Sequence, residues 1–213
     1  MQVQTIHTYP FVELDERAQK RAIKDHTYCS VCYEWWTFQY SQFKDLADSV
    51  GVTVDLQRTY GGGYGSQSGG SSYTATVDVL AMIQGVQDRA WEAWADSVAL
   101  DFPAMKVDRR VIRLIQSSRI TVSANVSPSH RNSAITIYIN CVYGYNLCPE
   151  YGNIDAVLCN LVDQIEEVCR ELNHYLYWSL EQEYEYLISE DSVRDTLMSD
   201  DMLFLEDGRE FLY

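Results

Sequence analysis

Apolar residues recur every three or four positions over residues 153–188, a stretch without glycine or proline. The series begins with Ile154 and Leu158 and continues to Leu180 and Leu187. This spacing places the apolar side chains on one face of an amphipathic α-helix. At 1.5 Å per residue the helix is expected to be about 54 Å long, which exceeds the width of a small domain. The pattern therefore predicts one long helix around which the rest of the chain is organised.

Shorter helical patterns occur elsewhere, and several begin at a residue that can cap a helix. Asp15 and Ser189 each precede such a pattern, and Gly51 ends another. Asp and Ser side chains accept hydrogen bonds from the first turn, while glycine adopts the left-handed conformation that ends helices. The pair Trp35-Trp36 is expected on the apolar side of its helix. Short helices are predicted at residues 15–26, 31–50, 79–86, 88–100, 109–116 and 189–198.

Alternating apolar and polar residues predict half-buried strands. The alternation is clearest in two pairs of strands, each joined by a turn, which predicts two antiparallel hairpins. With helices and antiparallel strands mixed, the predicted class is α+β. We expect an α+β core at residues 1–150, and an acidic long helix with a short helix and terminal hairpin at 151–213, packed on the same domain. Strands are predicted at residues 3–10, 52–57, 73–77, 120–126 and 135–139, and the terminal hairpin at 203–211.

Acidic residues concentrate at the C-terminal end. Residues 1–149 contain 14 acids and 13 bases, whereas residues 150–213 contain 17 acids and three bases. A surface with net charge −14 repels nucleic acid and anionic membranes, and indicates either a basic partner or simply a solvated acidic face. No run of 18 apolar residues and no basic-then-apolar N-terminus is present, so a soluble intracellular protein is expected.

Residues 60–73 form a glycine-rich loop between two predicted strands. Glycines let backbone N–H groups approach a phosphate closely, so a nucleotide site is one interpretation. The loop enters a strand rather than a helix, and no base lies between Arg58 and Arg89, so a structural or partner-contacting hairpin is preferred. The candidate loop residues are Tyr60, Gly62, Tyr64, Ser66, Gln67 and Gly69.

The spacing His26-x-x-Cys29-x-x-Cys32 resembles half of a zinc site, which Cys141 and Cys148 could complete. The spacings are irregular, so free thiols without a metal or other cofactor are the preferred prediction.

The histidines and carboxylates form no recognisable catalytic set, so we expect a protein that is not an enzyme. Trp91 and Trp94, like the pair Trp35-Trp36, could stack on single-stranded bases. Their helical spacing and the negative charge favour core packing instead.

Four parts of the chain together resemble a family of acidic proteins encoded by bacteriophages and prophages, some of which carry an antitoxin-like label. The family's loop motif is matched at Ser66 and Gln67, whereas its Gly-Asp-Gly is replaced by residues 68–70, Ser-Gly-Gly. The resemblance implies a phage origin and a location in the cytoplasm of the infected bacterial host. The segments that carry it are Trp35-Trp36, residues 60–73, residues 180–193 and residues 205–209.

The long helix carries eight acids and one arginine between Ile154 and Ile188, about one net charge per 7 Å, compared with one per ~1.7 Å in duplex DNA. It could act as a partial nucleic-acid mimic only if residues 189–210 added their eight acids beside it. Aromatic residues between Trp178 and Tyr186 predict contact with another chain, either a target or a second copy. Replacing both Trp178 and Leu180 by aspartate is expected to leave the fold largely intact and to abolish that contact. The predicted partner-binding residues are Asp163, Glu166, Glu167, Glu171, Trp178, Glu181, Glu183, Glu185 and Tyr186.

These features lead to one main functional hypothesis and two alternatives. The main hypothesis is a phage accessory protein that binds a basic host protein, one that handles nucleic acid or acts in defence, and inhibits it. The alternatives are an antitoxin-like neutraliser of a cognate toxin, and a nucleotide-binding protein that uses the glycine-rich loop.

Overall fold

The computed structural model describes residues 6–64, 69–95, 100–128, 133–141 and 152–211. The chain divides into two compact units. We call residues 1–36 with 181–213 the terminal unit, and residues 37–180 the sheet unit. This division differs from the boundary predicted near residue 150, because both ends of the chain build one unit together. The fold class is α+β, as predicted.

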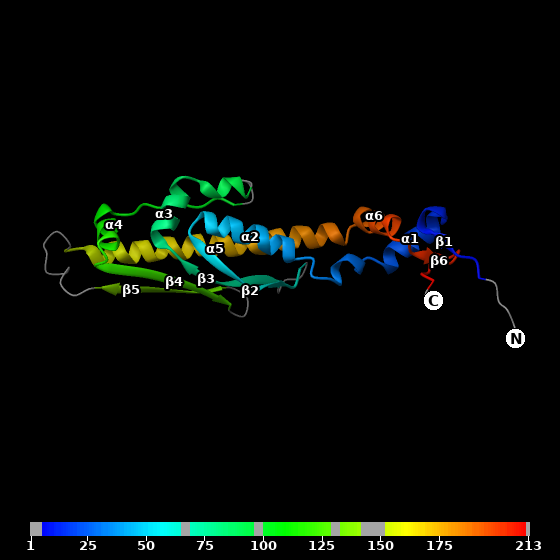
Figure 1. The fold of residues 1–213 in the computed structure, drawn as a ribbon, viewed down its shortest axis with the longest axis horizontal. Coiled ribbons are helices and arrows are strands. Elements are labelled where there is room, and N and C mark those ends of the chain that lie inside the picture. The colour runs from blue at the N-terminus through cyan, green and yellow to red at the C-terminus, as the bar shows by residue number, and fades with distance from the viewer. Residues whose placement is uncertain (1–5, 65–68, 96–99, 129–132, 142–151, 212–213) are drawn as a thin grey trace. The chain divides into compact units, whose positions relative to one another are not determined.

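The sheet unit is built on a four-stranded antiparallel sheet (Figure 1). Its strands follow the chain order and form two hairpins joined by the pairing of β3 with β4. Val54, Ala75, Val126 and Ile135 lie opposite one another across the four strands, in one apolar row. The strands are β2 (Val52–Gly62), β3 (Gly70–Val77), β4 (Ile120–Pro128) and β5 (Ser133–Cys141).

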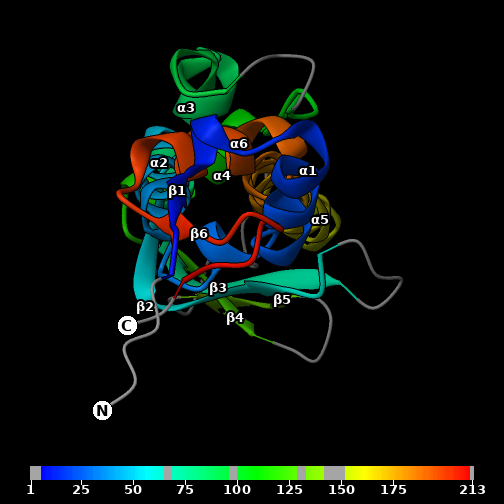
Figure 2. The ribbon, with the colours of Figure 1, turned by 90° about the vertical axis from the view of Figure 1, so that its right-hand side faces the viewer.

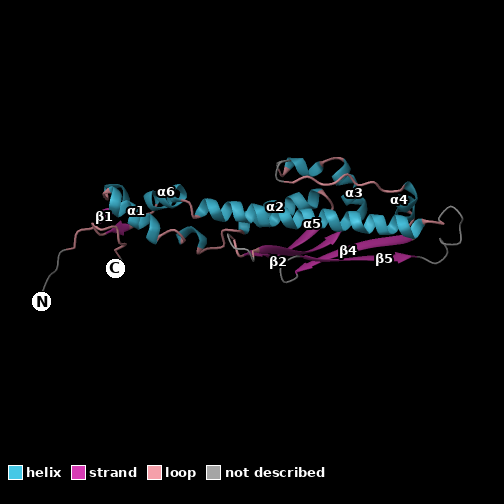
Figure 3. Ribbon diagram, turned by 180° about the vertical axis from the view of Figure 1, so that it is seen from behind, coloured by secondary structure: helices cyan, strands magenta, loops and turns pink. Residues whose placement is uncertain are grey.

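The helices of the sheet unit lie on one face of this sheet, and the views from the front and from behind agree on this (Figures 1 and 3). The long helix α5 (Ile154–Leu187) is held to β3 by Ser71 and Tyr73, whose hydroxyls donate to backbone carbonyls of α5. The opposite face carries exposed polar residues, including Thr53 and Thr76. The shorter helices are α2 (Thr37–Ser49), α3 (Val79–Gln87) and α4 (Arg109–Gln116).

The apolar stripe predicted on the long helix forms the core of the sheet unit. Its residues from Ile154 to Leu180 are buried at the predicted spacing, and Leu176 and Leu180 are fully inaccessible. The helix is confirmed within one residue at each end. It supplies residues 154–180 to the sheet unit and 181–187 to the terminal unit.

The terminal unit joins the first and last segments of the chain. β1 (Tyr9–Pro10) pairs antiparallel with β6 (Leu203–Phe204), and α1 (Glu16–Asp25) and α6 (Glu190–Ser199) pack beside them (Figure 2). Both predicted caps are confirmed, because Asp15 and Ser189 accept from backbone N–H groups three residues later. The core residues are Phe11, Leu14, Ala18, Ala22, Ile23, Val193, Leu197 and Phe204.

Two predicted helices are shorter than expected. The helix predicted at 31–50 begins at Thr37, where the chain passes from one unit to the other, and Cys29–Val31 form a separate 3₁₀ turn. In the described part of the helix predicted at 88–100 the chain forms a 3₁₀ turn, Ala90–Ala93, preceded by Arg89 in the left-handed conformation with φ of 54°, and residues 96–99 of that prediction lie outside the described residues. In consequence Trp36 and Trp94 are exposed instead of buried.

The predicted strands are largely confirmed, with differences in length. The N-terminal strand is two residues long in the described part, and residues 1–5 lie outside it. The terminal hairpin is reduced to a bridge between Phe204 and Glu210, closed by Gly208 with φ of 83°. Among the described residues, no helix is long and apolar enough to cross a lipid bilayer.

Candidate functional site: an acidic and aromatic surface

The negative charge is concentrated in the terminal unit. Its 69 residues contain 16 acids and six bases, a net charge of −10. The 144 residues of the sheet unit contain 15 acids and ten bases, a net charge of −5. Per residue, the terminal unit is about four times as acidic as the sheet unit. A charged partner would therefore be attracted most strongly to the terminal unit.

The nine predicted partner-binding residues are divided between the two units. Five of them belong to the sheet unit, where an arginine and a histidine contact three of the carboxylates. Arg170 forms ion pairs with Glu166 and Glu167, and His174 lies 3.8 Å from Glu171. Among the described residues the carboxylate of Asp163 has no such ion pair. The residues in the sheet unit are Asp163, Glu166, Glu167, Glu171 and Trp178, and those in the terminal unit are Glu181, Glu183, Glu185 and Tyr186.

In the terminal unit the last turns of α5 present both acids and aromatic rings. Glu185 is exposed, and the Tyr186 side chain is 61% exposed. Beyond α5, further exposed carboxylates extend the acidic surface along α6 and the segment after it. Their charges are evident in the sequence, but nothing in the local pattern indicates that they share a unit with the end of α5. These residues are Glu190, Asp191, Asp195, Asp200, Asp201 and Glu206.

An aromatic cluster accompanies this acidic surface within the terminal unit. The ring of Trp35 lies 6.1 Å from Tyr184 and 5.9 Å from Trp36, the second contact being edge-on. Trp36 and the nearby Tyr33 remain exposed, the latter at 74%. Large rings held by one another while partly exposed are the kind of residue that dominates binding at protein interfaces. We call Trp35, Trp36 and Tyr184 the terminal aromatic cluster.

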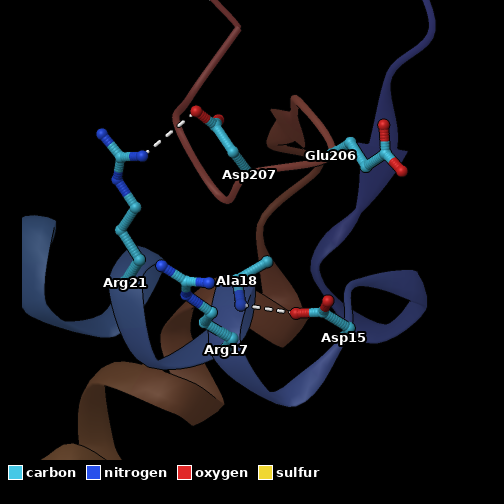
Figure 4. Close-up of a pocket in the computed structure, with 6 residues that line it drawn as sticks. All are labelled: Asp15, Arg17, Ala18, Arg21, Glu206 and Asp207. Carbon is cyan, nitrogen blue, oxygen red and sulfur yellow. Dashed lines mark hydrogen bonds and ion pairs between the residues drawn. The ribbon is translucent and has the colours of Figure 1, made fainter.

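A pocket of about 370 Å³ lies where α1 meets the turn before Gly208 (Figure 4). Arg21 donates to Asp207 at 3.1 Å across it. Burial acts to raise the pKa of Asp207, but hydrogen bonds from Arg209 and the charges of Arg209 and Arg21 together lower it. Arg17 lines the same pocket beside the carboxylates. Because acids and arginines face each other here, their contacts hold the acidic turn against α1. The mixed charges give the pocket no strong preference for anions or cations.

The glycine-rich loop is packed against tyrosines in the part that the structure describes. Tyr64 stacks on Tyr177 with ring centres 6.0 Å apart, and burial raises the pKa of Tyr64. A Cβ added to Gly61 would meet the Leu180 side chain and Tyr64, and one added to Gly69 would meet Tyr177 and a backbone carbonyl. Aromatic rings thus take up the space beside these glycines.

The remaining candidate loop residues are Tyr60, Gly62, Ser66 and Gln67. Tyr60 is exposed, and its hydroxyl lies where a side chain on Gly62 would begin. Ser66 and Gln67 lie outside the described residues. The observed contacts favour the structural interpretation of Gly61 and Gly69, since a side chain at either position would meet packed neighbours.

Trp178 and Leu180 differ in their environment. Trp178 is 43% exposed and its ring lies 5.7 Å from Tyr175, as expected for a surface residue. Leu180 is fully buried, so the prediction that both tolerate aspartate is wrong for Leu180. The helical period turned Leu180 to the core, two positions after an exposed tryptophan.

His26, from the spacing that resembles half of a zinc site, makes other contacts. His26 Nδ1 lies 2.8 Å from the Ala22 carbonyl oxygen, and Nε2 lies 3.3 Å from Glu210. Cys29 and Cys32 are free thiols, while Cys148 and the Cys141 side chain lie outside the description. Within the described ranges, no three His, Cys, Asp or Glu side chains gather as metal ligands would.

Comparison with known protein families identifies a domain family that matches most of the chain. The model of a domain family of unknown function, DUF8835, matches residues 35–190. The matched part contains the whole sheet unit, with Trp35, Trp36 and residues 181–190 of the terminal unit. None of the curated proteins and none of the solved structures matches the chain.

Proposed function

Since the chain belongs to the DUF8835 family, whose function is unknown, we propose a function from its own surface. The protein is a non-enzymatic phage accessory protein that binds a host protein and inhibits it. The contact is made by the acidic surface of the terminal unit together with the terminal aromatic cluster. The phage origin rests on the sequence resemblance, and the choice of surface rests on the charge distribution.

The observation that carries this proposal is the coincidence of charge and aromatic surface in one unit. A net charge of −10 attracts a basic partner from a distance and accelerates association. Exposed or half-exposed rings such as Trp36 and Tyr186 can then supply the short-range contact that charge alone lacks. Together they favour a protein partner with a basic surface over a small molecule.

A basic surface of this kind is characteristic of proteins that handle nucleic acid. The acids of α6 and of the following segment lie in the same unit as the end of α5, which raises the charge above that of the helix alone. The acidic surface would then occupy the position of a phosphate backbone on the partner, as a partial nucleic-acid mimic. Direct binding of nucleic acid through this surface is excluded by its sign.

The proposal is tested with a variant that removes charge from the terminal unit alone. Glu185→Gln, Asp195→Asn and Asp201→Asn replace exposed carboxylates by neutral side chains of the same shape. Host proteins captured by the wild type would be identified, and their recovery by the variant measured. We expect the specific partner to be lost, because it depends on the charge that these residues supply.

The matched control removes three charges from the sheet unit through Asp45→Asn, Asp88→Asn and Asp101→Asn. This variant has the same net charge as the first, and it should retain the partner. If both variants lost the partner equally, binding would depend only on the total charge of the protein. If both variants retained it equally, the acidic surface would not be the contact. Either result contradicts the proposal.

A further inference from the structure

The two edges of the sheet differ in how they are protected. At one edge, β2 carries the ion pair between Asp55 and Arg58, and its register shifts between Asp55 and Tyr60. Charges and irregularities on an edge strand oppose pairing with another strand. At the other edge, β5 contains no charged residue, proline or glycine over residues 133–141. The β5 edge therefore has none of these protective features.

The β5 strand is also regular along its whole length. All nine of its residues pair with β4 in one unbroken register, from Ser133 opposite Pro128 to Cys141 opposite Ile120. Among the described residues β5 pairs with β4 only, so its second edge is the end of the sheet. Half of its backbone donors and acceptors point away from β4, as in any edge strand, and can pair with a further strand.

The apolar side chains of β5 are incompletely buried. Ile135, Ile137 and Ile139 point to the helix-covered face and are half-buried. Val126, which lies opposite Ile135 on the neighbouring strand, is fully buried. The difference arises because, within the described ranges, β5 has a neighbouring strand on one side only. A strand added at this edge would cover the three isoleucines.

From these observations we propose that β5 pairs with β5 of a second copy of this chain, antiparallel and about a two-fold axis at Ile137. This surface is separate from the acidic surface of the proposed function, and the inference does not depend on that function. The pairing joins the four-stranded sheets of the two copies into one continuous sheet. The helices of both copies then lie on the same face of this sheet.

The sequence of β5 fits this symmetry. With Ile137 at the centre of the strand, Ile137 lies opposite its own copy and Ile135 lies opposite Ile139 of the second copy. Directly opposite residues share a face of the sheet, so the isoleucines of both strands meet on the covered side. On the open side Thr136 lies opposite Tyr138 of the second copy, and both side chains are exposed in the single chain. No charges are brought together, although each chain carries a net charge of −15.

A second copy satisfies this edge better than an unrelated strand for a physical reason. The contact is self-complementary and closes on itself, so it ends at a dimer and leaves no further free β5 edge. A foreign strand would have to reproduce the same uncharged alternation. The mass in solution decides between the two, because pairing of copies gives twice the 24.5 kDa of one chain.

The test uses paired substitutions on the open face of β5 in the full chain, with mass measured by light scattering. Thr136→Glu with Tyr138→Glu places two pairs of like charges across the two-fold axis, so the mass should fall from that of two chains to that of one. Thr53→Glu with Thr121→Glu adds the same charge to exposed positions of β2 and β4, and should leave the dimer intact.

A charge-swapped mixture tests the register itself. Thr136→Lys with Tyr138→Lys should likewise be monomeric, and mixing it with the glutamate variant should restore the mass of two chains, since each glutamate then lies opposite a lysine. A monomeric wild type would overturn the proposal. So would a dimer that survives the glutamate pair, or variants that fail to recombine.

Discussion

The hydroxyl of Tyr73 on β3 donates a hydrogen bond of 3.0 Å to the backbone carbonyl of Cys169 on α5. Both residues are fully buried, and the Tyr73 ring packs edge-on against Phe43 at 5.2 Å. This contact joins the long helix to the sheet at a point that only side chains from distant parts of the chain can create. It also gives two predictions on stability.

The first concerns the hydrogen bond itself. Tyr73→Phe removes the hydroxyl and keeps the ring, so the free energy of unfolding should fall by about 1 kcal/mol. Urea unfolding followed by circular dichroism measures the change. Tyr138→Phe is the control, because that side chain is exposed on the open face of the sheet and should change nothing. Equal stability of the Tyr73 variant and the wild type would show that the bond contributes nothing.

The second concerns pH. Burial raises the pKa of the Cys169 thiol from 9.0 to about 12, although the interaction of the Tyr73 hydroxyl with the thiol itself acts in the opposite direction. Above pH 9 the unfolded chain releases this proton while the folded chain keeps it. The contribution of the protonated thiol to the free energy of unfolding is therefore fully present below pH 9 and is lost as pH rises toward 12. The decline is at most ~1.4 kcal/mol per pH unit for one group.

Cys169→Ala isolates the contribution of this thiol. Between about pH 9 and pH 10 the variant's free energy of unfolding should decline less steeply than that of the wild type. Cys159→Ala provides the comparison, since Cys159 is exposed on the same helix, and it should keep the wild-type slope. Identical slopes for all three proteins would disprove the assignment.

The third prediction distinguishes Trp178 from Leu180, which both lie on the part of α5 that belongs to the sheet unit. Leu180→Asp places a charge in the core and should unfold the sheet unit, while Trp178→Asp should leave it folded because that side chain is 43% exposed. Thermal unfolding of each single variant is the measurement. If both variants kept the wild-type unfolding transition, the result would contradict a core position for the Leu180 side chain.

The fourth prediction concerns the glycines. Gly69→Ala should destabilise the hairpin, because the added carbon meets a backbone carbonyl that cannot move away. Gly62→Ala meets only the hydroxyl of Tyr60, an exposed side chain that can turn aside, and should be tolerated. A loop that used its glycines to bind a nucleotide would respond differently. Both variants would then be as stable as the wild type, and nucleotide-induced thermal shifts would be lost in each.

Local patterns predicted most of the fold. The long helix and the caps at Asp15 and Ser189 depend on periodicity and on hydrogen bonds within a few residues. Trp94 was misplaced because Arg89 takes a left-handed conformation that ends the helical run and lets Trp91 pack against Phe102. The local sequence pattern does not predict this backbone conformation, because it depends on tertiary packing.

The candidate site was predicted in part. The acidic character and the aromatic end of α5 were evident in the composition, but their division between two units was not. Trp35 contacts Tyr184 only because residues 1–36 and 181–213 fold together. A contact between residues so far apart in the chain follows from the tertiary fold, which periodicity does not encode.

The central claim, that the terminal unit binds its partner through charge, is tested most directly by the salt dependence of the dissociation constant. It would be measured for the captured partner by calorimetry over a range of sodium chloride concentrations. We predict that the dissociation constant rises steeply with salt, and that the slope is smaller for the variant with Glu185→Gln, Asp195→Asn and Asp201→Asn. A dissociation constant that does not change with salt, or equal slopes for the two proteins, would contradict the account.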